Sequence, residues 1–521
     1  MSSVTDPRAA LPRLDRHRPK GPPVRPSRSG RRRAFVLIGV HVLIGLHFLH
    51  WGLTGSSVTP VEPSESMQTV ELGRLNAGFL LFVALIASTL VFGRWFCGWG
   101  CHIVALQDLS AWLLRRVGLK PRPLRSRLLV LAPFAVAYAM FLHPIVLHWW
   151  DPVGKPLPAP SEWQLKLVTD DLWVTFPGWI MAPITLLVVG GLIVWWLGAK
   201  GFCTHGCPYG AFFALADRVA PLRIVVSDAC EHCGHCTSVC SSNVRVHEEV
   251  AKYGHVVDPG CMKCLDCVSV CPKDALSYGP ARPQPFAVSQ QRIAARADFS
   301  WGEEIAVALL AFVATQFTFR GAWFGEGVPL LLAVGLGVIT AVFALLGWRL
   351  LRRPDVEFQH TVLKRGRRFT SAGFAALGLV LLWLAFSAHT FAAQRLRESA
   401  IDGVRQLRGG ASPAQLEQAL AGTDRALSWD LVDDPRVQEM RGLVLRGLGR
   451  HADAERALLG ALAARDRLDY VEANLALAAY AMDPQRARWQ QARALLEAVL
   501  ANDPQNEIAL RLHERLGERG R

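Results

Sequence analysis

The 521-residue chain is poor in charge: Asp, Glu, Lys and Arg together make up only 19% of it, against 51% hydrophobic residues. Its mean hydropathy is +0.23, whereas soluble domains carry about 25% charged residues. This composition argues against a wholly soluble protein and indicates a membrane protein of two or more units. No small-residue cleavage site follows the first apolar stretch, so that stretch is expected to stay as an uncleaved helix.

Cysteine is missing before residue 97 and after residue 271, so all twelve cysteines lie in one third of the chain. A disulfide framework would require an extracellular location, but this part of the chain is rich in Arg and Lys. Reduced thiols in a reducing compartment are therefore expected.

Seven apolar stretches are long enough to cross a hydrocarbon core of about 30 Å. They lie at about 34–53, 75–93, 128–149, 178–198, 303–319, 327–349 and 370–392. Arg and Lys are abundant in the connections 94–127, 199–302 and 349–369 and scarce in the other three, so the positive-inside rule predicts seven helices with the N-terminus in the cytoplasm. The arm 1–33, with ten Lys or Arg residues, is interpreted as a topology signal rather than a nucleic-acid-binding segment.

Two consecutive runs of cysteine share one spacing, Cys-x2-Cys-x2-Cys-x3-Cys. In two-cluster ferredoxins three closely spaced thiolates bind one [4Fe–4S] cluster and the fourth binds the other cluster. The predicted ligands of cluster 1 are Cys230, Cys233, Cys236 and Cys271, and those of cluster 2 are Cys261, Cys264, Cys267 and Cys240. A pair of zinc sites is the alternative, but zinc motifs usually join two CxxC units across a longer gap. Ser241 stands where a proline is expected after Cys240, which leaves the ligand intact.

The other four cysteines form a repeat: Phe96-Cys97-x-x-Gly100-Cys101 recurs as Phe202-Cys203-x-x-Gly206-Cys207, 106 residues later. Each copy follows a predicted helix pair at its cytoplasmic end. A duplicated four-helix unit would bring these four thiols close together under the membrane. A shared cluster, copper or a redox-active disulfide would each suit such soft ligands. The alternative is a purely structural role, in which the cysteines only pack at the helix ends.

Four histidines lie near the outer ends of the first and third predicted helices: His47, His50, His143 and His148. Ionisable residues at membrane depth suggest function, here proton acceptance from a quinol, or haem or metal binding. The alternative is interfacial histidines within an aromatic belt. If quinol is oxidised on that side, electrons must cross most of the core of about 30 Å to reach the predicted clusters. Either quinone binds nearer the cysteine loops or a further cofactor exists.

Residues 393–521 are rich in Ala, Leu, Arg and Glu at helical spacing and contain neither Cys nor Lys. Ala457-Leu458-Leu459 recurs as Ala494-Leu495-Leu496, an offset of 37 residues. This period is close to that of tetratricopeptide arrays. A degenerate tetratricopeptide-like array is therefore predicted, with an unrelated small helical bundle as the alternative.

The stretch Arg94-Trp95-Phe96-Cys97-Gly98-Trp99-Gly100-Cys101, the stretch Gly201-Phe202-Cys203-x3-Cys207-Pro208-Tyr209-Gly210 and the two ferredoxin runs resemble the NapH/NosR-type membrane polyferredoxins. The CcoG/FixG-type proteins of oxidase assembly share this plan. The resemblance covers about residues 34–290. It implies electron transfer between the quinone pool and a partner redox system, with the CxxxC pairs near the membrane surface. The family shows Cys-Pro twice, but His102 follows Cys101 here and becomes a possible extra ligand.

The expected architecture is an all-α membrane bundle with an inserted α+β ferredoxin-like module and a helical tail. The predicted parts are an N-terminal arm (1–33), a duplicated four-helix domain (34–219), a cytoplasmic module for two [4Fe–4S] clusters (220–290), three further helices (291–392) and a periplasmic tail (393–521) that docks a protein partner. The expected function is electron transfer in the bacterial inner membrane, with possible quinol-oxidising or metal-reducing activity. The alternative is a copper-reducing or copper-delivering factor for oxidase assembly. A nucleic-acid partner is not expected, and a further metal or a quinone is a possible additional cofactor.

Overall fold

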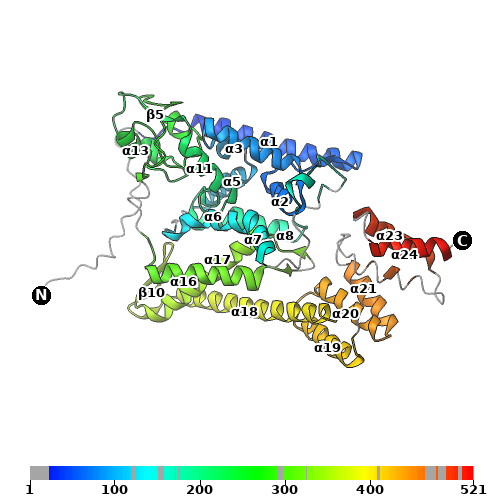
Figure 1. Cartoon of the computed structure of the whole chain (residues 1–521). Coiled ribbons are helices and arrows are strands. Elements are labelled where there is room, and N and C mark those ends of the chain that lie inside the picture. Colours follow the sequence, from blue (N-terminus) through cyan, green and yellow to red (C-terminus); the bar gives the residue numbers. More distant parts are fainter. Residues whose placement is uncertain are drawn as a thin grey trace. The chain divides into compact units, whose positions relative to one another are not determined.

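The computed structural model describes residues 23–519, with gaps at 120–123, 151–157, 171, 174–175, 291–296, 324–325, 408–410, 464–473, 475–476, 479–480, 482–487 and 503–506. The chain divides into two compact units (Figure 1). Unit 1 comprises Met1–Phe176 and Leu186–Ile305, and unit 2 comprises Pro177–Thr185 and Ala306–Arg521. Each unit is described by itself.

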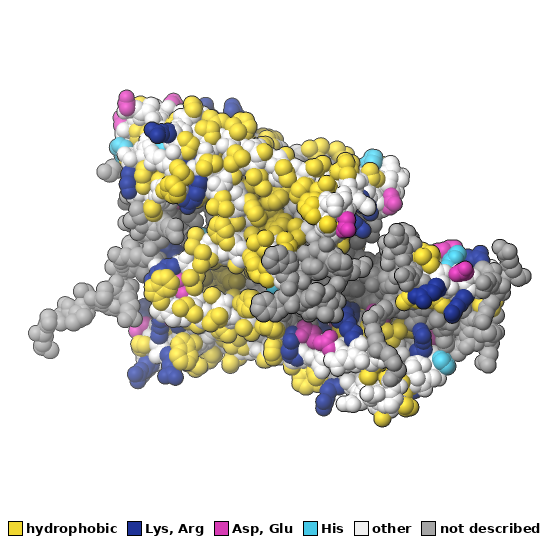
Figure 2. All heavy atoms as spheres, in the orientation of Figure 1, with side chains coloured by type: hydrophobic (Ala, Val, Ile, Leu, Met, Phe, Trp, Pro, Cys, Tyr) yellow, Lys and Arg dark blue, Asp and Glu magenta, His cyan; other side chains and the backbone are white. Residues whose placement is uncertain are grey.

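Helices cover all seven apolar stretches that the sequence predicts to be helical. Five helical segments are long and apolar enough to cross a membrane: Arg28–Thr54, Leu128–Val146, Trp301–Phe319, Leu330–Arg352 and Ser371–Arg405. Two shorter apolar segments are Ala77–Phe92 and Met181–Leu197. Large side chains on α1 (Arg28–Thr54) point outward, with Phe35 72% and Leu53 78% exposed, and hydrophobic side chains dominate much of the visible surface in Figure 2. Such a surface suits contact with lipid.

The membrane part of unit 1 combines long helices with shorter ones. Its elements are α3 (Ala77–Phe92), α4 (Trp95–Trp99), α5 (His102–Arg116), α6 (Ala132–Ala137), α7 (His143–Trp150), α9 (Ile193–Leu197), α10 (Gly201–His205) and α11 (Pro208–Val219). The connections after α1 and before α9 pair with each other. Strand β1 (Ser57–Val58) pairs with β4 (Val168–Thr169), and β2 (Arg74–Leu75) with β3 (Gln164–Leu165). Two loops predicted on the same side of the membrane therefore meet, as the topology requires.

Helices α5 and α11 run back along the membrane helices. Tyr209, at the start of α11, packs edge-on against Phe82 of α3, with 5.6 Å between ring centroids. Eight residues later, Asp217 accepts a hydrogen bond from the backbone N–H of Arg94, just past the end of α3. Ten residues of helix separate Phe82 from Phe92, about 15 Å at 1.5 Å per residue. The N-terminus of α11 therefore lies well inside the helical unit.

Helix α5 likewise runs back alongside α1. Asp108, midway along α5, pairs with Arg33 near the start of α1. His102, at the start of α5, lies 3.7 Å from Glu62, which belongs to the connection after α1. Both cysteine loops therefore fold back into the helical unit, and the expectation that they lie under the membrane stays a prediction. Irregular backbone at membrane depth is tolerated only where protein surrounds it.

The ferredoxin-like module comprises β5 (Leu222–Val226), α12 (His235–Ser238), α13 (Val246–Tyr253), α14 (Asp266–Ser269) and β6 (Leu276–Pro280). Strands β5 and β6 are antiparallel, with Ile224 opposite Tyr278. Outside these two strands, His255 forms a single bridge with Val225. A small apolar core of Ile224, Val244, Val246, Val250, Val256 and Leu276 lies between the two cysteine runs. So small a core suits a module that its bound clusters help to stabilise.

Unit 2 begins its membrane part with α8 (Met181–Thr185) and most of α16 (Trp301–Ala314), followed by the short β7 (Ala322–Trp323) and β8 (Glu326–Gly327) and by α17 (Leu330–Arg352). A three-stranded sheet of β9 (Val356–Phe358), β10 (Thr361–Arg365) and β11 (Arg368–Phe369) leads into α18 (Ser371–Arg405). The expected boundary at residue 393 falls inside α18, which is one continuous helix of 35 residues.

The C-terminal helices of unit 2 are built on the last turns of α18. They are α19 (Pro413–Trp429), α20 (Pro435–Gly447), α21 (His451–Ala463), α23 (Trp489–Asn502) and α24 (Glu507–Arg519). Ile401 and Val404 of α18 share one core with Leu420, Val437 and Leu445 of α19 and α20. The tail is helical as expected, while the tetratricopeptide interpretation stays a prediction because much of 464–487 lies outside the described residues.

Candidate functional site

The two cysteine runs fold alike, 31 residues apart. Positive backbone φ angles occur at three matching pairs of residues: His232 and Lys263, Gly234 and Leu265, and Asn243 and Asp274. Non-glycine residues rarely adopt such angles. A loop held in this conformation turns sharply enough for three closely spaced cysteines to face one point, so the shared angles support one ligand-binding geometry for both runs.

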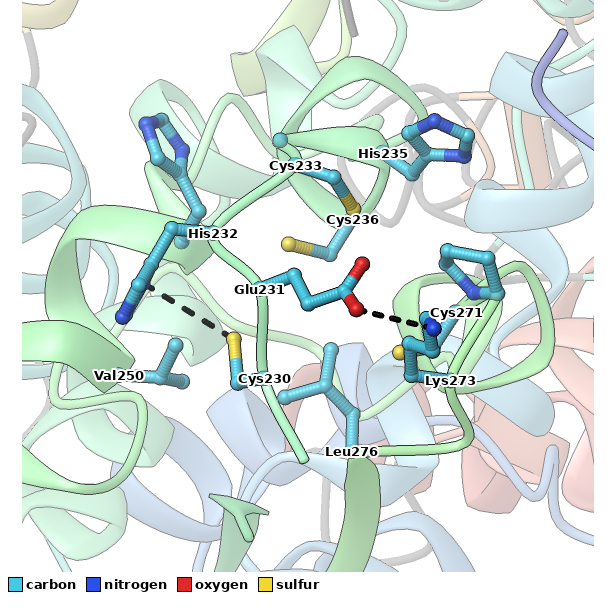
Figure 3. Close-up of a pocket in the computed structure, with 13 residues that line it drawn as sticks. Cys230, Glu231, His232, Cys233, His235, Cys236, Val250, Cys271, Lys273 and Leu276 are labelled. Carbon is cyan, nitrogen blue, oxygen red and sulfur yellow. Dashed lines mark hydrogen bonds and ion pairs between the residues drawn. The ribbon is translucent and has the colours of Figure 1, made fainter. Parts of the chain in front are cut away.

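The four thiols predicted for cluster 1 line one hollow. Its walls hold Cys230, Cys233 and Cys236 from the first run and Cys271 from the second, together with Val250 and Leu276. Figure 3 shows these cysteines around a common space, with the ion pair of Glu231 and Lys273 drawn across it. Burial raises the pKa of the Cys236 thiol to about 12.

The four thiols predicted for cluster 2 line a second hollow. Cys240 from the first run meets Cys261, Cys264 and Cys267 from the second, with Ile224 and Met262 beside them. Burial raises the pKa of the Cys264 thiol to about 12, with the carboxylate of Asp266 adding to the effect. Burial likewise raises the pKa values of the Cys240 and Cys267 thiols. The crossed pairing expected from spacing, with one thiol exchanged between the runs, is therefore what the fold brings together.

A cubane cluster fits this donor set. Four soft thiolates around one hollow are the ligands of [4Fe–4S] clusters, and when bound such a cluster accepts and donates single electrons. Because a cluster binds thiolates, its binding would release the protons of these thiols. Within the described parts of the chain, no three His, Cys, Asp or Glu side chains are close enough to hold a single metal ion.

The four thiols of the CxxxC repeat lie near one another. Burial, with Cys203 and Cys97 as charged neighbours, raises the pKa of the Cys101 thiol. Burial and the nearby Cys97 and Cys101 raise the pKa of the Cys207 thiol to about 12. The thiols of each copy therefore interact electrostatically with those of the other copy. We call Cys97, Cys101, Cys203 and Cys207 the membrane thiol set.

The two copies have the same local fold. In the first, the backbone N–H groups of Gly100 and Cys101 both donate to the carbonyl of Phe96, and in the second those of Gly206 and Cys207 both donate to Phe202. Cys101 and Cys207 then precede the first residues of α5 and α11. The Cys207 sulfur accepts a hydrogen bond of 3.4 Å from the backbone N–H of Gly210. A helix N-terminus favours the thiolate form of a cysteine placed there.

Each copy carries a buried cation three residues before its first cysteine. The guanidinium of Arg94 lies near the Cys97 and Cys207 thiols, and its Nη2 donates to the carbonyl of Cys203 at 3.2 Å. The ammonium of Lys200 is close enough to Cys203 to favour its thiolate and pairs with Asp108 at 2.5 Å. Both cations are over 95% buried. Neither was identified from the sequence, although the repeat places both at the same position.

Further polar groups around the membrane thiol set were also missed. Gln107, fully buried on α5, donates to the Cys203 sulfur at 2.9 Å and accepts from the backbone N–H of Phe202 at 3.1 Å. Glu62 reaches His102, although the sequence places the two on opposite sides of a predicted membrane helix. His102 therefore faces a carboxylate, and its role as an extra ligand stays a prediction.

The four predicted outer histidines differ in the contacts that they make. His47 contacts the carbonyl of Val58 at 3.0 Å and His50 the hydroxyl of Ser57 at 3.1 Å, so both tie α1 to β1. His143 lies beside Tyr138, with 5.9 Å between ring centroids. The side chain of His148 is outside the described residues. The structure thus gives two of the four a hydrogen-bonding role, while a redox or metal role stays a prediction.

Two family models match this part of the chain. A "4Fe-4S binding domain" matches residues 77–120 and again 180–225, which are the two copies of the CxxxC repeat. A "4Fe-4S dicluster domain" matches residues 222–272, which hold both ferredoxin runs. Both models end before residue 273, so the later helices and the tail lie outside them. No solved structure matches the chain.

Several similar proteins have ferredoxin-type names. The methylamine utilization ferredoxin-type protein MauN is 28% identical over 34% of this chain in Methylobacillus flagellatus and 31% identical over 34% of it in Methylorubrum extorquens. The ferredoxin-type protein NapH of Escherichia coli is 27% identical over 38% of this chain and 67% of its own length. The chain spans 60% of the length of the two MauN proteins. In residues 77–120 and 180–272, this chain is similar to the NapH-type iron–sulfur membrane proteins.

Proposed function

We propose that this chain is an integral-membrane electron-transfer protein that passes electrons between the quinone pool and a partner redox system through two [4Fe–4S] clusters. The observation that carries the proposal is the crossed pairing of thiols, in which each hollow is lined by three cysteines of one run and the fourth of the other. The same crossing is the ligand pattern of two-cluster ferredoxins.

Electron paramagnetic resonance on anaerobically purified, reduced protein tests the two clusters. The expected result is a spectrum of two interacting [4Fe–4S]⁺ centres with about eight iron atoms per chain. An iron-free preparation with stoichiometric zinc would contradict the proposal. Iron that is present but not reducible by a quinol or by a flavodoxin-like donor would instead indicate a scaffold with purely structural clusters.

The membrane thiol set is proposed as a third redox site, in which Cys97, Cys101, Cys203 and Cys207 bind one anionic metal–thiolate group. The buried guanidinium of Arg94 supports this over a disulfide, because it lies near these sulfurs and a neutral disulfide gives it no charge to balance. Isolated buried cations are costly. Cys97→Ser together with Cys203→Ser should lower the metal content and leave the signals of the two ferredoxin-type clusters in place. Unchanged metal content would rule this site out.

The quinone pool is the proposed exchange partner at the membrane end. The membrane thiol set adjoins the starts of α5 and α11, which fold back into the helical unit, and a quinone bound there would leave a shorter crossing than the sequence suggests. Oxidation of a quinol releases two electrons and two protons, and the electrons leave one at a time because clusters carry one each. Reduction of the clusters by a quinol analogue in nanodiscs, measured by loss of visible absorbance, tests this step.

The proposed orientation follows the charge of the connections. Seven helices would place the basic N-terminal arm and the ferredoxin-like module in the cytoplasm and the C-terminal helices in the periplasm of a bacterial inner membrane, where they would dock a protein partner. The pairing of β1 with β4 and of β2 with β3 supports this, since it joins two connections assigned to the same side.

A copper-handling assembly factor is the second candidate function. Its supporting observation is that four soft thiols from the two copies lie near one another, since thiolates favour Cu(I). Copper bound at one equivalent or more, and lost in Cys97→Ser or Cys203→Ser while both ferredoxin-type clusters persist, would favour it. Iron in the membrane thiol set would exclude it.

A further inference from the structure

The two ferredoxin-type cysteine sets differ in what covers them. The loop that carries Cys261, Cys264 and Cys267 is fastened to the membrane part of unit 1 at several points. Lys263 pairs with Asp217 of α11 at 2.9 Å, and both side chains are at least 98% buried. Asp266 accepts from Arg33 of α1 at 2.7 Å. Buried, well-bonded ion pairs fix the position of the groups that they join.

Neutral contacts fasten the same loop. The indole N–H of Trp99 donates to the carbonyl of Lys263 at 3.0 Å, and Nη1 of Arg94 donates to the carbonyl of Pro259 at 2.9 Å. Both donors belong to the first CxxxC copy or adjoin it. The loop of the second cysteine run is thus bonded directly to the loop of the membrane thiol set.

The closest approach is at Gly98, next to Cys97. A Cβ atom placed on Gly98 would lie 2.3 Å from the carbonyl oxygen of Met262 and 3.4 Å from the Cα of Cys264. Only a residue without a side chain allows this approach. One residue of the membrane thiol set and one ligand of the second hollow are therefore separated by a single backbone contact.

The first hollow has an exposed rim and lacks such contacts with the membrane part. The lining residues of both hollows come from the module itself. The ion pair at its rim is exposed, with 61% of the Glu231 side chain and 52% of the Lys273 side chain accessible. Within the described residues, no hydrogen bond or ion pair joins the run Cys230–Cys240 to a membrane helix.

We propose that the two cysteine sets have fixed and different positions in the electron path. The set of Cys240, Cys261, Cys264 and Cys267 is the membrane-side site, and the set of Cys230, Cys233, Cys236 and Cys271 is the face on which a soluble one-electron carrier protein docks. Arg33, Asp217 and Trp99 are the positioning residues. They hold the membrane-side set, which lines the second hollow, against the membrane thiol set. Only electrons cross these contacts, so no bond is made or broken there. The quinol class supplies them at the membrane end and the soluble carrier takes them at the other.

The inference rests on the proposed function, but solvent exposure tests it without any turnover. The probe is an aqueous dysprosium complex, which speeds the spin relaxation of paramagnetic centres near the water. In the reduced full chain in nanodiscs, one half of the signal should relax strongly with the complex and the other half weakly. In Cys264→Ser the surviving signal should be the strongly relaxed one, and in Cys233→Ser the weakly relaxed one. Equal relaxation of both halves, or the reverse assignment, overturns the proposal.

A second measurement keeps the test valid if a cysteine substitution removes both clusters. Iron release from the otherwise unaltered chain to an aqueous chelator should occur in two phases of equal size. Trp99→Phe removes only the hydrogen bond to Lys263. The slow phase should then become about fivefold faster, which corresponds to one hydrogen bond of about 1 kcal/mol. Glu231→Gln is the matched control, because it breaks only an exposed ion pair. A single phase, or acceleration of the fast phase by Trp99→Phe, overturns the proposal.

These outcomes are separable from failure of the proposed function. A chain that no quinol reduces would contradict the quinone proposal, yet dithionite would still generate the signals for the dysprosium experiment. With a quinol donor, Trp99→Phe should slow reduction, whereas reduction by dithionite from the water should be unchanged. Equal slowing with both donors would mean that Trp99 has only a structural role.

Discussion

Gly98→Ala is the sharpest perturbation that the structure offers, because it adds one methyl group at the contact between the membrane thiol set and the second hollow. The new Cβ would lie 2.3 Å from the Met262 carbonyl oxygen, where ordinary contact begins near 3.4 Å. The two loops must therefore separate by about 1 Å, since the obstacle is backbone and cannot rotate away. Overpacking of this kind costs about 1–3 kcal/mol.

Two readings check this prediction. Thermal unfolding of the cluster-loaded protein should occur a few degrees lower, since about 1 kcal/mol shifts the Tm of a domain of this size by roughly 2–4 °C. Reduction by a quinol analogue should also be slower, because electron transfer weakens steeply with distance, while reduction by dithionite should be unaffected. Both effects have one cause, a wider gap at Cys264.

Gly39→Ala on α1 is the matched control, because a Cβ there meets nothing within 4 Å. It should be neutral or slightly stabilising, by up to about 1 kcal/mol, since alanine favours helix over glycine. If Gly98→Ala is as stable as Gly39→Ala and is reduced by quinol as fast as the unaltered chain, the loops are not in contact and the reasoning from the structure is refuted.

Three further predictions concern separate parts of the chain. Cys271→Ser should remove the solvent-exposed half of the paramagnetic signal and Cys267→Ser the shielded half, although both belong to one run, and loss of the same half in both would contradict the crossed ligand sets. Asp434→Ala removes the N-cap of α20, whose carboxylate accepts from the backbone N–H of Arg436 at 2.9 Å, and should cost about 1 kcal/mol of helical stability by circular dichroism. Burial alone would raise the pKa of Asp434, but the hydrogen bonds and charge of Arg436 outweigh it and lower that pKa. The stability contributed by the cap should therefore be complete above a pH of about 4 and be lost as the pH falls through the lowered pKa. A stability difference that does not depend on pH would contradict this. A reporter fused after Arg521 should be active in the periplasm, and activity in the cytoplasm would show that the number of spanning helices is even.

The cysteine spacing predicted the composition of both hollows because ligand loops are local. A loop that holds three cysteines within seven residues can surround only a small group, such as a metal cluster. The fourth cysteine follows one turn later. The structure brings together the sets around Cys230 and Cys261 that this reasoning named. Apolar length was equally informative, since each of the seven stretches is a helix.

The return of the two CxxxC loops into the helical unit could not be predicted from the sequence. Hydropathy gave each CxxxC loop a place after an apolar helix, which suggests a position at the surface. The return of α5 and α11 into the unit depends on packing between distant residues, such as Tyr209 on Phe82, and on the contact of Glu62 with His102. No periodicity within either segment encodes such partners.

The end of α18 was misplaced for a related reason. Composition changes near residue 393, where the lipid-facing residues stop, but helix propensity does not, so the helix continues to Arg405. Ile401 and Val404 then serve as core for the tail. A change of surroundings along one helix resembles a domain boundary when only composition is considered.

Buried charge connects the membrane thiol set with the second hollow. Five cations in this region are at least 93% buried: Arg33, Arg94, Lys200, Arg223 and Lys263. Three carboxylates face them: Asp108, Asp217 and Asp266. Glu65 and Glu249 are also buried in unit 1. A [4Fe–4S] cluster with four thiolates carries net negative charge, and an unbalanced buried charge costs several kcal/mol. Anionic groups bound at the two sites would therefore be stabilised by the nearby cations, which would link the stability of the membrane part to the proposed chemistry.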